Sequence, residues 1–207
     1  MKLTKNELKV QKDALKMYQR YLPTLTLKKQ QLQAEIRTIE AKANAVRKEK
    51  EDLERGFHSW IAVFGEKEAF PDGVITVSNI RKGMGNIAGV AIPTFAGADF
   101  SRGDYDLYET PLWVDIAANH MEKAMSLDLE AEVLDEQVRL LEAELRSTSQ
   151  RVNLFEKVKI PETQENIKKI SIYMADQQVN AVVRSKISKR KVADRNAAAS
   201  ESEVYSL

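Results

Sequence analysis

The 207-residue sequence contains no cysteine, only eight glycines and five prolines, and no long uncharged apolar run. Without cysteine the chain has no disulfide framework, no thiolate nucleophile and no cysteine zinc site, which fits a reducing compartment. No apolar signal-peptide core follows the first seven residues. The longest weakly polar stretch, 87–98, is far shorter than the roughly 20 residues of a membrane-spanning helix. We therefore expect a cytoplasmic chain with no direct membrane insertion.

The motifs that catalysis and cofactor binding need are also missing. Gly83, Gly85 and Gly89 match neither the phosphate-binding loop nor the dinucleotide fingerprint, so we interpret them as turn glycines. His58 and His120 are 62 positions apart and have no further His or Cys at metal-ligand spacing. Acidic pairs are frequent, but a pair of helices offers no pocket that would shift their pKa values for acid–base chemistry. The sequence therefore predicts a non-catalytic chain with no cofactor and no metal.

Charge is abundant and unevenly distributed. Charged residues make up 30% of the chain, and the formal net charge of +1 conceals basic and acidic segments. Residues 1–16 contain five lysines against two acids, residues 122–144 eight acids against two bases, and residues 184–195 six bases against one acid. Such a composition, poor in glycine and proline, is typical of long exposed helices rather than of a globular core.

Apolar residues near the N-terminus recur every seven positions in two series. Two apolar positions per heptad, sustained over this length, predict a coiled-coil seam, the line of side chains along which two helices pack. A helix from about residue 4 to 64 would be roughly 90 Å long and would need a partner of similar length. The first series is Leu8, Leu15, Leu22, Lys29, Ile36, Ala43, Lys50 and Phe57, and the second is Tyr18, Leu25, Leu32, Ile39, Val46, Leu53 and Trp60.

The second half of the chain supplies a partner with the same pattern, and this arm is the longer of the two. Its heptads predict a second coiled-coil helix that could satisfy the seam of the first. The two series are Ala117, Ala124, Ala131, Val138, Leu145 and Val152, and Leu127, Leu134, Leu141 and Phe155, continuing past Pro161 through Ile167, Ile170, Met174 and Ala181.

Between the arms the heptad pattern stops. Turn signals at 71–73 and 83–86 border two segments rich in β-branched residues, 74–77 and 87–92, which predicts a short β-hairpin at about 74–93. Residues 99–109 contain Gly, Asp and Tyr without periodicity, so we expect a loop there. Thr110-Pro111 then offers a cap and a first-turn proline for the second helix.

The predicted fold class is therefore all-α, a long two-helix antiparallel coiled coil with a short β-hairpin and a loop inserted between the arms. We expect an N-terminal arm at 1–64, a connecting region at 65–110, a C-terminal arm with a basic end at 111–199 and a tail at 200–207. The acidic segment 122–144 would then face the mixed charge at 37–50. A parallel homodimer is the alternative arrangement.

The two helical prolines suggest a register for the pair. Pro23 and Pro161 should each bend its arm, because an interior proline removes a helix hydrogen bond and clashes with the preceding turn. If the two bends lie opposite each other, the numbers of facing residues sum to about 184. Residues from Arg184 onward would then overhang the N-terminus.

The basic run at the C-terminal end is the most pointed electrostatic feature. Exposed Lys and Arg can bind phosphates, anionic lipid or an acidic protein surface, and the run alone does not choose among them. No aromatic stacking platform accompanies it, which disfavours nucleic acid as a partner. The candidate partner-binding residues are Arg184, Lys186, Lys189, Arg190 and Lys191.

Two motifs resemble a known family. The run from Arg151 through Phe155 to Glu156, followed by Val158-Lys159-Ile160-Pro161, resembles the C-terminal motif of the D subunit of the vacuolar/archaeal-type (V-type/A-type) rotary ATPases. The run from Asn86 to Pro93 is similar to the central signature of that family, and the heptads and the basic end agree in order and spacing. The matching positions are Arg151, Val152, Asn153, Phe155, Glu156 and Pro161 in the helical arm, and Gly89, Val90 and Pro93 in the hairpin.

The resemblance implies a central-stalk rotor shaft that transmits torque between the catalytic head and the membrane ion-translocating rotor and does not itself bind ATP. It implies that the terminal end of the helices enters the hexameric head of catalytic A and B subunits. The F subunit would bind to the shaft, and the C subunit, which is called d in eukaryotes, would bind the opposite end. The resemblance further implies a peripheral location on the membrane and a hairpin that influences coupling from outside the catalytic sites. A generic coiled-coil scaffold or tether is the alternative function.

Overall fold

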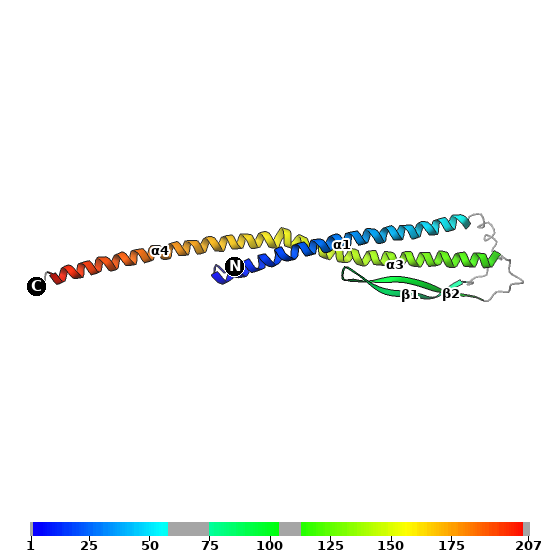
Figure 1. Cartoon of the computed structure of the whole chain (residues 1–207), viewed down its shortest axis with the longest axis horizontal. Helices are drawn as coiled ribbons and strands as arrows, with labels where there is room; N and C mark the ends of the chain where they lie inside the picture. Colours follow the sequence, from blue (N-terminus) through cyan, green and yellow to red (C-terminus); the bar gives the residue numbers. More distant parts are fainter. Residues whose placement is uncertain (1, 58–74, 104–112, 205–207) are drawn as a thin grey trace. The chain divides into compact units, whose positions relative to one another are not determined.

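The computed structural model describes residues 2–57, 75–103 and 113–204. These elements fall into two compact units, unit 1 with residues 1–24 and 151–207, and unit 2 with residues 25–150. Both units contain a segment of the first helix and a segment of the C-terminal helical arm (Figure 1). The elements are α1 (Lys5–Phe57), β1 (Ile75–Ile87), β2 (Val90–Arg102), α3 (Trp113–Leu154), the π-helical turn η1 (Phe155–Lys159) and α4 (Ile160–Val204).

In unit 2, the part of α1 from residue 25 packs antiparallel against α3 around a narrow apolar core. Leu32 and Leu141 are fully buried there. Every described member of the two predicted α1 series, and of the two series in the second arm up to Phe155, is buried or half-buried. The intramolecular antiparallel pair is therefore confirmed, rather than the parallel homodimer. The core residues are Leu32, Ile36, Ile39, Ala43, Val46, Ile92, Leu127, Ala131, Leu134 and Leu141.

Ion pairs between α1 and α3 accompany this core. Lys28 pairs with Glu144 at 2.6 Å and Lys42 with Glu130 at 3.1 Å, so the residue numbers across the pair sum to 172. Further pairs are Arg47 with Asp135 and Lys50 with Asp128. Each exposed pair is worth at most about 1 kcal/mol, but a slipped register would lose all of them together. The predicted facing of the acidic segment against basic residues at 42–50 is thus confirmed.

In unit 1, the register is marked by an aromatic contact between the two arms. The ring of Tyr18 on α1 lies 5.1 Å from that of Phe155, and these numbers sum to 173. Pro23 follows Tyr18 by five residues and Pro161 follows Phe155 by six, in antiparallel directions. The two prolines are therefore about 16 Å apart along the helices at 1.5 Å per residue. The prediction that they face each other is wrong.

The π-helical turn η1 absorbs one extra residue in the heptad pattern. The seam residues Val152 and Phe155 would be followed at intervals of seven by positions 159 and 162. A π turn holds one residue more than an α turn, and here the Ile160 N–H donates to the Phe155 carbonyl. Because of the bulge, the apolar residues on both sides of it still face α1, although their spacing across it is eight residues instead of seven. The seam residues after it, buried or half-buried, are Ile160, Thr163, Ile167, Ile170 and Met174.

Helix α4 continues beyond the paired segment as a single helix. Ile170 is fully buried and Met174 half-buried, but every side chain from residue 175 to 196 is exposed. Within unit 1, Figure 1 shows α4 running on past the N-terminal end of α1. This overhang, residues 175–196, begins nine positions earlier than the predicted Arg184. Ala181, which the sequence pattern placed on the seam, is exposed.

The connecting region holds a longer β-hairpin than predicted. β1 and β2 have 13 residues each and pair antiparallel from Ile87 and Val90 outward. Ala88 and Gly89 form the turn with φ of 51° and 83°, and a two-residue type I′ turn needs such positive values at both positions. The predicted turn at 83–86 is wrong, because these residues lie in β1, and residues 99–102 belong to β2 rather than to a loop.

The glycines at 83 and 85 serve a close approach between strands instead. A Cβ at Gly83 would lie 2.6 Å from Thr94 Oγ1, and one at Gly85 would lie 3.1 Å from Thr94 Cγ2. Gly89 remains a turn glycine, as predicted. The predicted cap at Thr110-Pro111, together with positions 58–64 of the first arm, lies outside the described residues.

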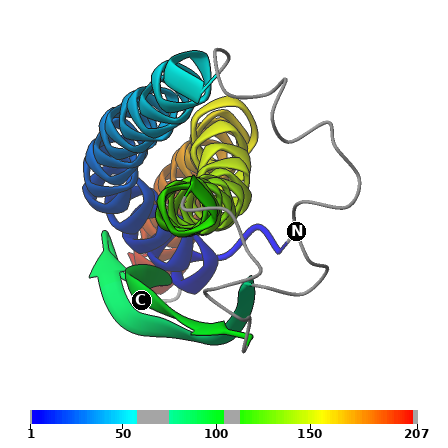
Figure 2. The same cartoon turned by 90° about the vertical axis from the view of Figure 1, so that its right-hand side faces the viewer.

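The hairpin forms a third layer on the helical pair of unit 2. Along its length it lies beside α3 on the side away from α1, as the two views show (Figures 1 and 2). Its tip reaches the groove between the helices, where Ile92, 3% exposed, joins the core. Ile87, Ala88 and Val90 pack against the same core. The hairpin is therefore anchored by burial at its tip.

Candidate functional site

The five predicted partner-binding cations all lie on the overhang of α4. Arg184, Lys186, Lys189, Arg190 and Lys191 are exposed, and within the described part of the chain none of them forms an ion pair. Because helical positions advance by about 100° per residue, the five surround the helix rather than forming one stripe. The overhang therefore presents positive charge in every direction.

The overhang also carries apolar residues that sequence reasoning did not single out. Val179, Val183 and Ile187 follow one another at intervals of four residues and therefore share one side of the helix. They are 62%, 47% and 50% exposed. Their spacing was visible in the sequence, but the heptad reading assigned this stretch to the paired arm. Val182, next to this side, is 55% exposed as well.

The C-terminal family motif surrounds the π-helical turn. Val152 is buried on the seam and Phe155 packs on Tyr18, whereas Arg151, Asn153 and Glu156 are exposed. Pro161 is the second residue of α4, two positions after the end of the turn, and the Thr163 hydroxyl donates to the Lys159 carbonyl at 2.5 Å. The motif therefore combines two seam residues with an exposed face at the point where the helix changes its repeat.

The predicted hairpin residues occupy the tip of the hairpin and its contact with α3. Gly89 forms the turn and Val90 is half-buried against the core. Pro93 lies in β2, and its carbonyl accepts a 2.5 Å hydrogen bond from Nε2 of Gln137 on α3. Gln137 is only 7% exposed. Sequence reasoning missed it, because a polar residue beside an apolar series carries no periodic signal.

A second polar contact holds the base of the hairpin. Arg102, the last residue of β2, donates through Nε and Nη2 to both carboxylate oxygens of Glu122, at 2.7 and 3.1 Å, and to Asn119. The hydrogen bond from Arg102 lowers the pKa of the Glu122 carboxyl, against a smaller opposing effect of burial. A bidentate Arg–carboxylate pair is the strongest common side-chain geometry, so the base is held by charge and the tip by burial.

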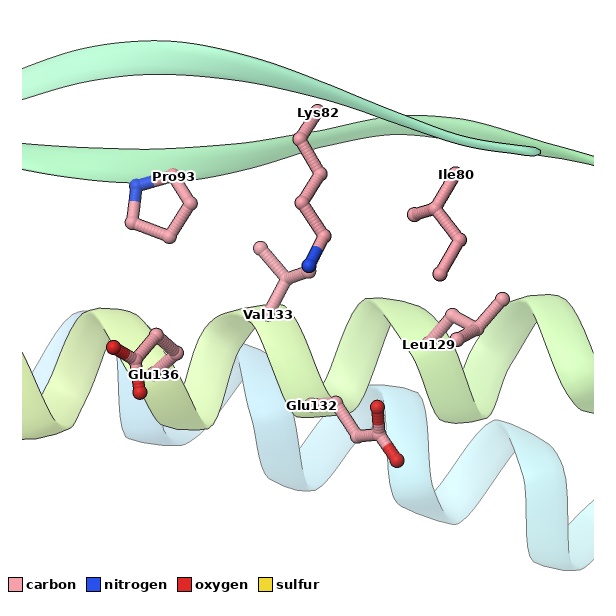
Figure 3. A pocket seen from close by; sticks show the side chains of 7 residues that line it. All are labelled: Ile80, Lys82, Pro93, Leu129, Glu132, Val133 and Glu136. Carbon is pink, nitrogen blue, oxygen red and sulfur yellow. The ribbon is translucent and has the colours of Figure 1, made fainter.

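Between the two anchor points the hairpin stands off from α3. A cleft of about 390 Å³ opens there, with Ile80 and Lys82 of β1 above it and Leu129 and Val133 of α3 below (Figure 3). Pro93 closes one end, while Glu132 and Glu136 lie on the helix at its rim. Glu136 binds Arg139 of its own helix, which lowers the pKa of the glutamate.

The described residues hold no cluster of three or more His, Asp or Glu side chains that could bind a metal. His120 packs edge-on against Phe57, with ring centroids 4.0 Å apart, and His58 lies outside the described residues. Among the described helices, none is long and apolar enough to cross a membrane. The predicted site residues lie on three features of the described chain, the overhang, the motif around η1 and the hairpin.

Known proteins are similar to this chain over almost its whole length. The family of ATP synthase D subunits matches residues 7–190. A V-type ATP synthase D subunit of Borreliella burgdorferi is 47% identical over 196 residues, which cover 95% of this chain and 96% of that protein. Proteins of the same name from Chlamydia felis and Chlamydia trachomatis serovar L2 are 36% and 35% identical, covering 94% and 93% of this chain and 95% and 96% of theirs. The prediction of a central-stalk subunit of a V-type rotary ATPase, rather than a generic scaffold, is confirmed: the chain belongs to the family of ATP synthase D subunits.

Proposed function

We propose that this chain is the non-catalytic rotor axle of its rotary ATPase and transmits torque between the catalytic head and the membrane rotor. The observation that carries the proposal is the overhang, 22 consecutive exposed positions on one helix beyond the paired segment. A helix of this kind, with a strongly basic and partly apolar surface, is unstable in isolation and is suited to enclosure by other subunits. Because the chain belongs to the family of ATP synthase D subunits, the enclosing subunits would be those of a rotary ATPase.

Within that proposal, the overhang enters the head formed by the catalytic A and B subunits. The F subunit binds to the paired segment, and the C subunit binds the end of unit 2 opposite the hairpin tip. The assembly is a cytoplasmic stalk and head, peripheral to the membrane. The chain itself supplies no group for ATP hydrolysis.

The charges of the overhang suit a bearing better than a fixed joint. An exposed charge pair contributes about 1 kcal/mol or less and is weakened by salt. Contacts of this strength can be made and broken at each rotational step. Because Arg184, Lys189 and Arg190 point in different directions from one helix, some positive charge faces each surrounding protein at every angle.

The test is to replace Arg184, Lys186, Lys189, Arg190 and Lys191 together with glutamine in the full complex. We expect ATP-driven rotation to slow or lose its coupling to ion transport, and the salt dependence of turnover to weaken. A matched control replaces five exposed cations of the paired segments, Lys16, Arg37, Lys48, Arg146 and Lys168, with glutamine. Unchanged rotation and assembly in the five-residue variant would refute the bearing.

We also propose that the hairpin modulates turnover from outside the catalytic sites. It is packed on the helical pair through its tip and its base, and Met84 on β1 is 82% exposed and free to meet another protein of the complex. Replacing residues 75–102 by a short flexible linker should change the rate of ATP hydrolysis while the complex still assembles. Loss of the α1–α3 pair in that variant would make the hairpin structural instead.

A further inference from the structure

Gln137 is a buried polar side chain that links α3 to another element. Three polar residues in the described part of the chain are buried, Gln137, Thr148 and Thr163. The Thr163 hydroxyl bonds to its own helix, whereas Gln137 donates to the carbonyl of Pro93 in the hairpin. This hydrogen bond lies beside Ile92, where the tip enters the core.

The strand geometry explains why this carbonyl needs a partner. Ile87 and Val90 close the two-residue turn, and antiparallel pairs alternate from there between hydrogen-bonded and non-hydrogen-bonded. Pro93 faces Met84 in a non-hydrogen-bonded pair, as a residue without an N–H must. Its carbonyl therefore points away from β1, toward an edge with no further strand. Near the core, that oxygen depends on a side-chain donor.

The neighbouring positions on α3 cannot replace Gln137. One heptad away on either side, the same face carries Glu130 and Glu144, which pair with Lys42 and Lys28. An ionised carboxylate only accepts hydrogen bonds, so neither could serve the Pro93 carbonyl if the hairpin slid along the helix. Two open clefts border the contact, one of about 390 Å³ with Pro93 in its lining and one of about 270 Å³ with Gln137 in its lining.

We propose that Gln137 is the positioning residue that sets where the hairpin lies on the helical pair, through donation to the Pro93 carbonyl. The effect of this residue on ATP turnover rests on the proposed function of the hairpin. Its effect on the position of the hairpin does not. The two parts can therefore be tested separately.

The first test measures amide hydrogen exchange in three full-length variants. Gln137→Met removes both polar groups, Gln137→Glu keeps the shape but removes the donor at neutral pH, and Gln150→Glu is an exposed control on the same helix. At pH 7.5 the amides of residues 87–92 should exchange roughly tenfold faster in the two Gln137 variants, the effect of leaving one buried carbonyl unpaired. Amides of the buried α1 segment 32–46 should be unchanged.

The Gln137→Glu variant adds a readout that a merely structural residue would not give. A protonated carboxyl regains an O–H donor, so the ratio of variant to wild-type exchange should return toward one as the pH falls from 7.5 to about 5, given that burial raises the pKa of such a carboxyl. The negative charges of Glu130 and Glu136 also raise the pKa of a carboxyl at position 137, whereas the positive charges of Lys42 and Lys82 lower it. Gln137→Met should show no such recovery.

Two results would overturn the positioning role: unchanged exchange at the tip in both Gln137 variants, or equal acceleration of the tip and the α1 core, which would make Gln137 an ordinary core residue.

The second test measures ATP turnover of the assembled complex with Gln137→Glu. We expect kcat to change in the same direction as in the hairpin deletion, with KM for ATP unchanged and no additional effect in the double variant. Faster tip exchange with unaltered turnover would refute the coupling function of the hairpin and leave the positioning role standing.

Discussion

Because η1 holds one extra residue, we expect a one-residue deletion inside it to be tolerated, unlike a deletion elsewhere in the helix. Deleting one residue from a coiled-coil helix normally rotates everything after it by about 100° and breaks the seam. Here a deletion inside the π turn, of the exposed Lys157, should convert the turn to a regular α-helix. Ile160, Thr163 and the later seam residues would then follow Val152 and Phe155 at intervals of seven.

The same deletion made after the turn should be costly. Removing Lys168 places Ser171 where Ile170 now lies and Ala175 where Met174 lies. Ile170 is fully buried, and truncation of such a residue costs about 2–5 kcal/mol, to which the half-buried Met174 adds. We expect a loss of about 3–5 kcal/mol, which lowers Tm by roughly 6–20 °C for a protein of this size. The Lys157 deletion should change stability by less than about 1 kcal/mol, because the seam burial is preserved.

The comparison is made by thermal and urea unfolding, followed by circular dichroism, with Pro161→Ala present in all variants. That substitution allows the restored helix to make its hydrogen bond at position 161 and removes the steric cost of proline, about 3 kcal/mol in a helix interior. Equal destabilisation by the two deletions would refute the assignment of η1 as a stored extra residue. So would a Lys157 deletion that costs more than the Lys168 deletion.

Two further predictions concern the hairpin. Arg102 lowers the pKa of Glu122 in the folded state, so the stability from this contact is present above the unfolded pKa near 4.3 and is lost as the pH falls through the folded pKa. The difference in free energy of unfolding between wild type and Arg102→Met should therefore be largest near neutral pH and shrink below about pH 4. A difference that stayed constant from pH 7 to 3 would contradict the pairing. Gly83→Val should lower the free energy of unfolding by about 1–3 kcal/mol, since its Cβ would approach Thr94 Oγ1 to 2.6 Å. Gly56→Ala, with open space around it, should instead raise it by roughly 0.5–1 kcal/mol, as measured by urea unfolding. Similar effects of the two changes would show that the strand contact at Gly83 is not restrictive.

The heptads made the helical pair predictable, because burial along a coiled-coil seam is set by local spacing alone. Every described member of the predicted α1 series is at least half-buried. The register was not predictable from Pro23 and Pro161, since a proline disturbs only its own helix and carries no information about the partner. The charges gave better information, because Lys42 and Glu130 must come together for either to be paired.

Other features were visible in the sequence but had two explanations. The interval of eight residues between Val152 and Ile160 indicates a skipped position, yet only the structure shows that a π turn absorbs it. Gly83 and Gly85 fit a turn as well as a close strand contact, and the choice depends on Thr94 across the hairpin. Both the π turn and the role of these glycines depend on packing against another segment of the chain, which local sequence patterns do not show.

A rotor axle must rotate relative to the catalytic subunits during ATP turnover, and this rotation can be measured directly. Because the chain has no cysteine, Met84→Cys introduces a single thiol at a side chain that is 82% exposed on the hairpin. A fluorescent or bead probe attached there can be followed in single complexes whose catalytic head is immobilised. We expect the probe to rotate continuously in one direction when ATP is added, whereas a probe that stays fixed relative to the head while ATP is hydrolysed would contradict the role of a rotor axle.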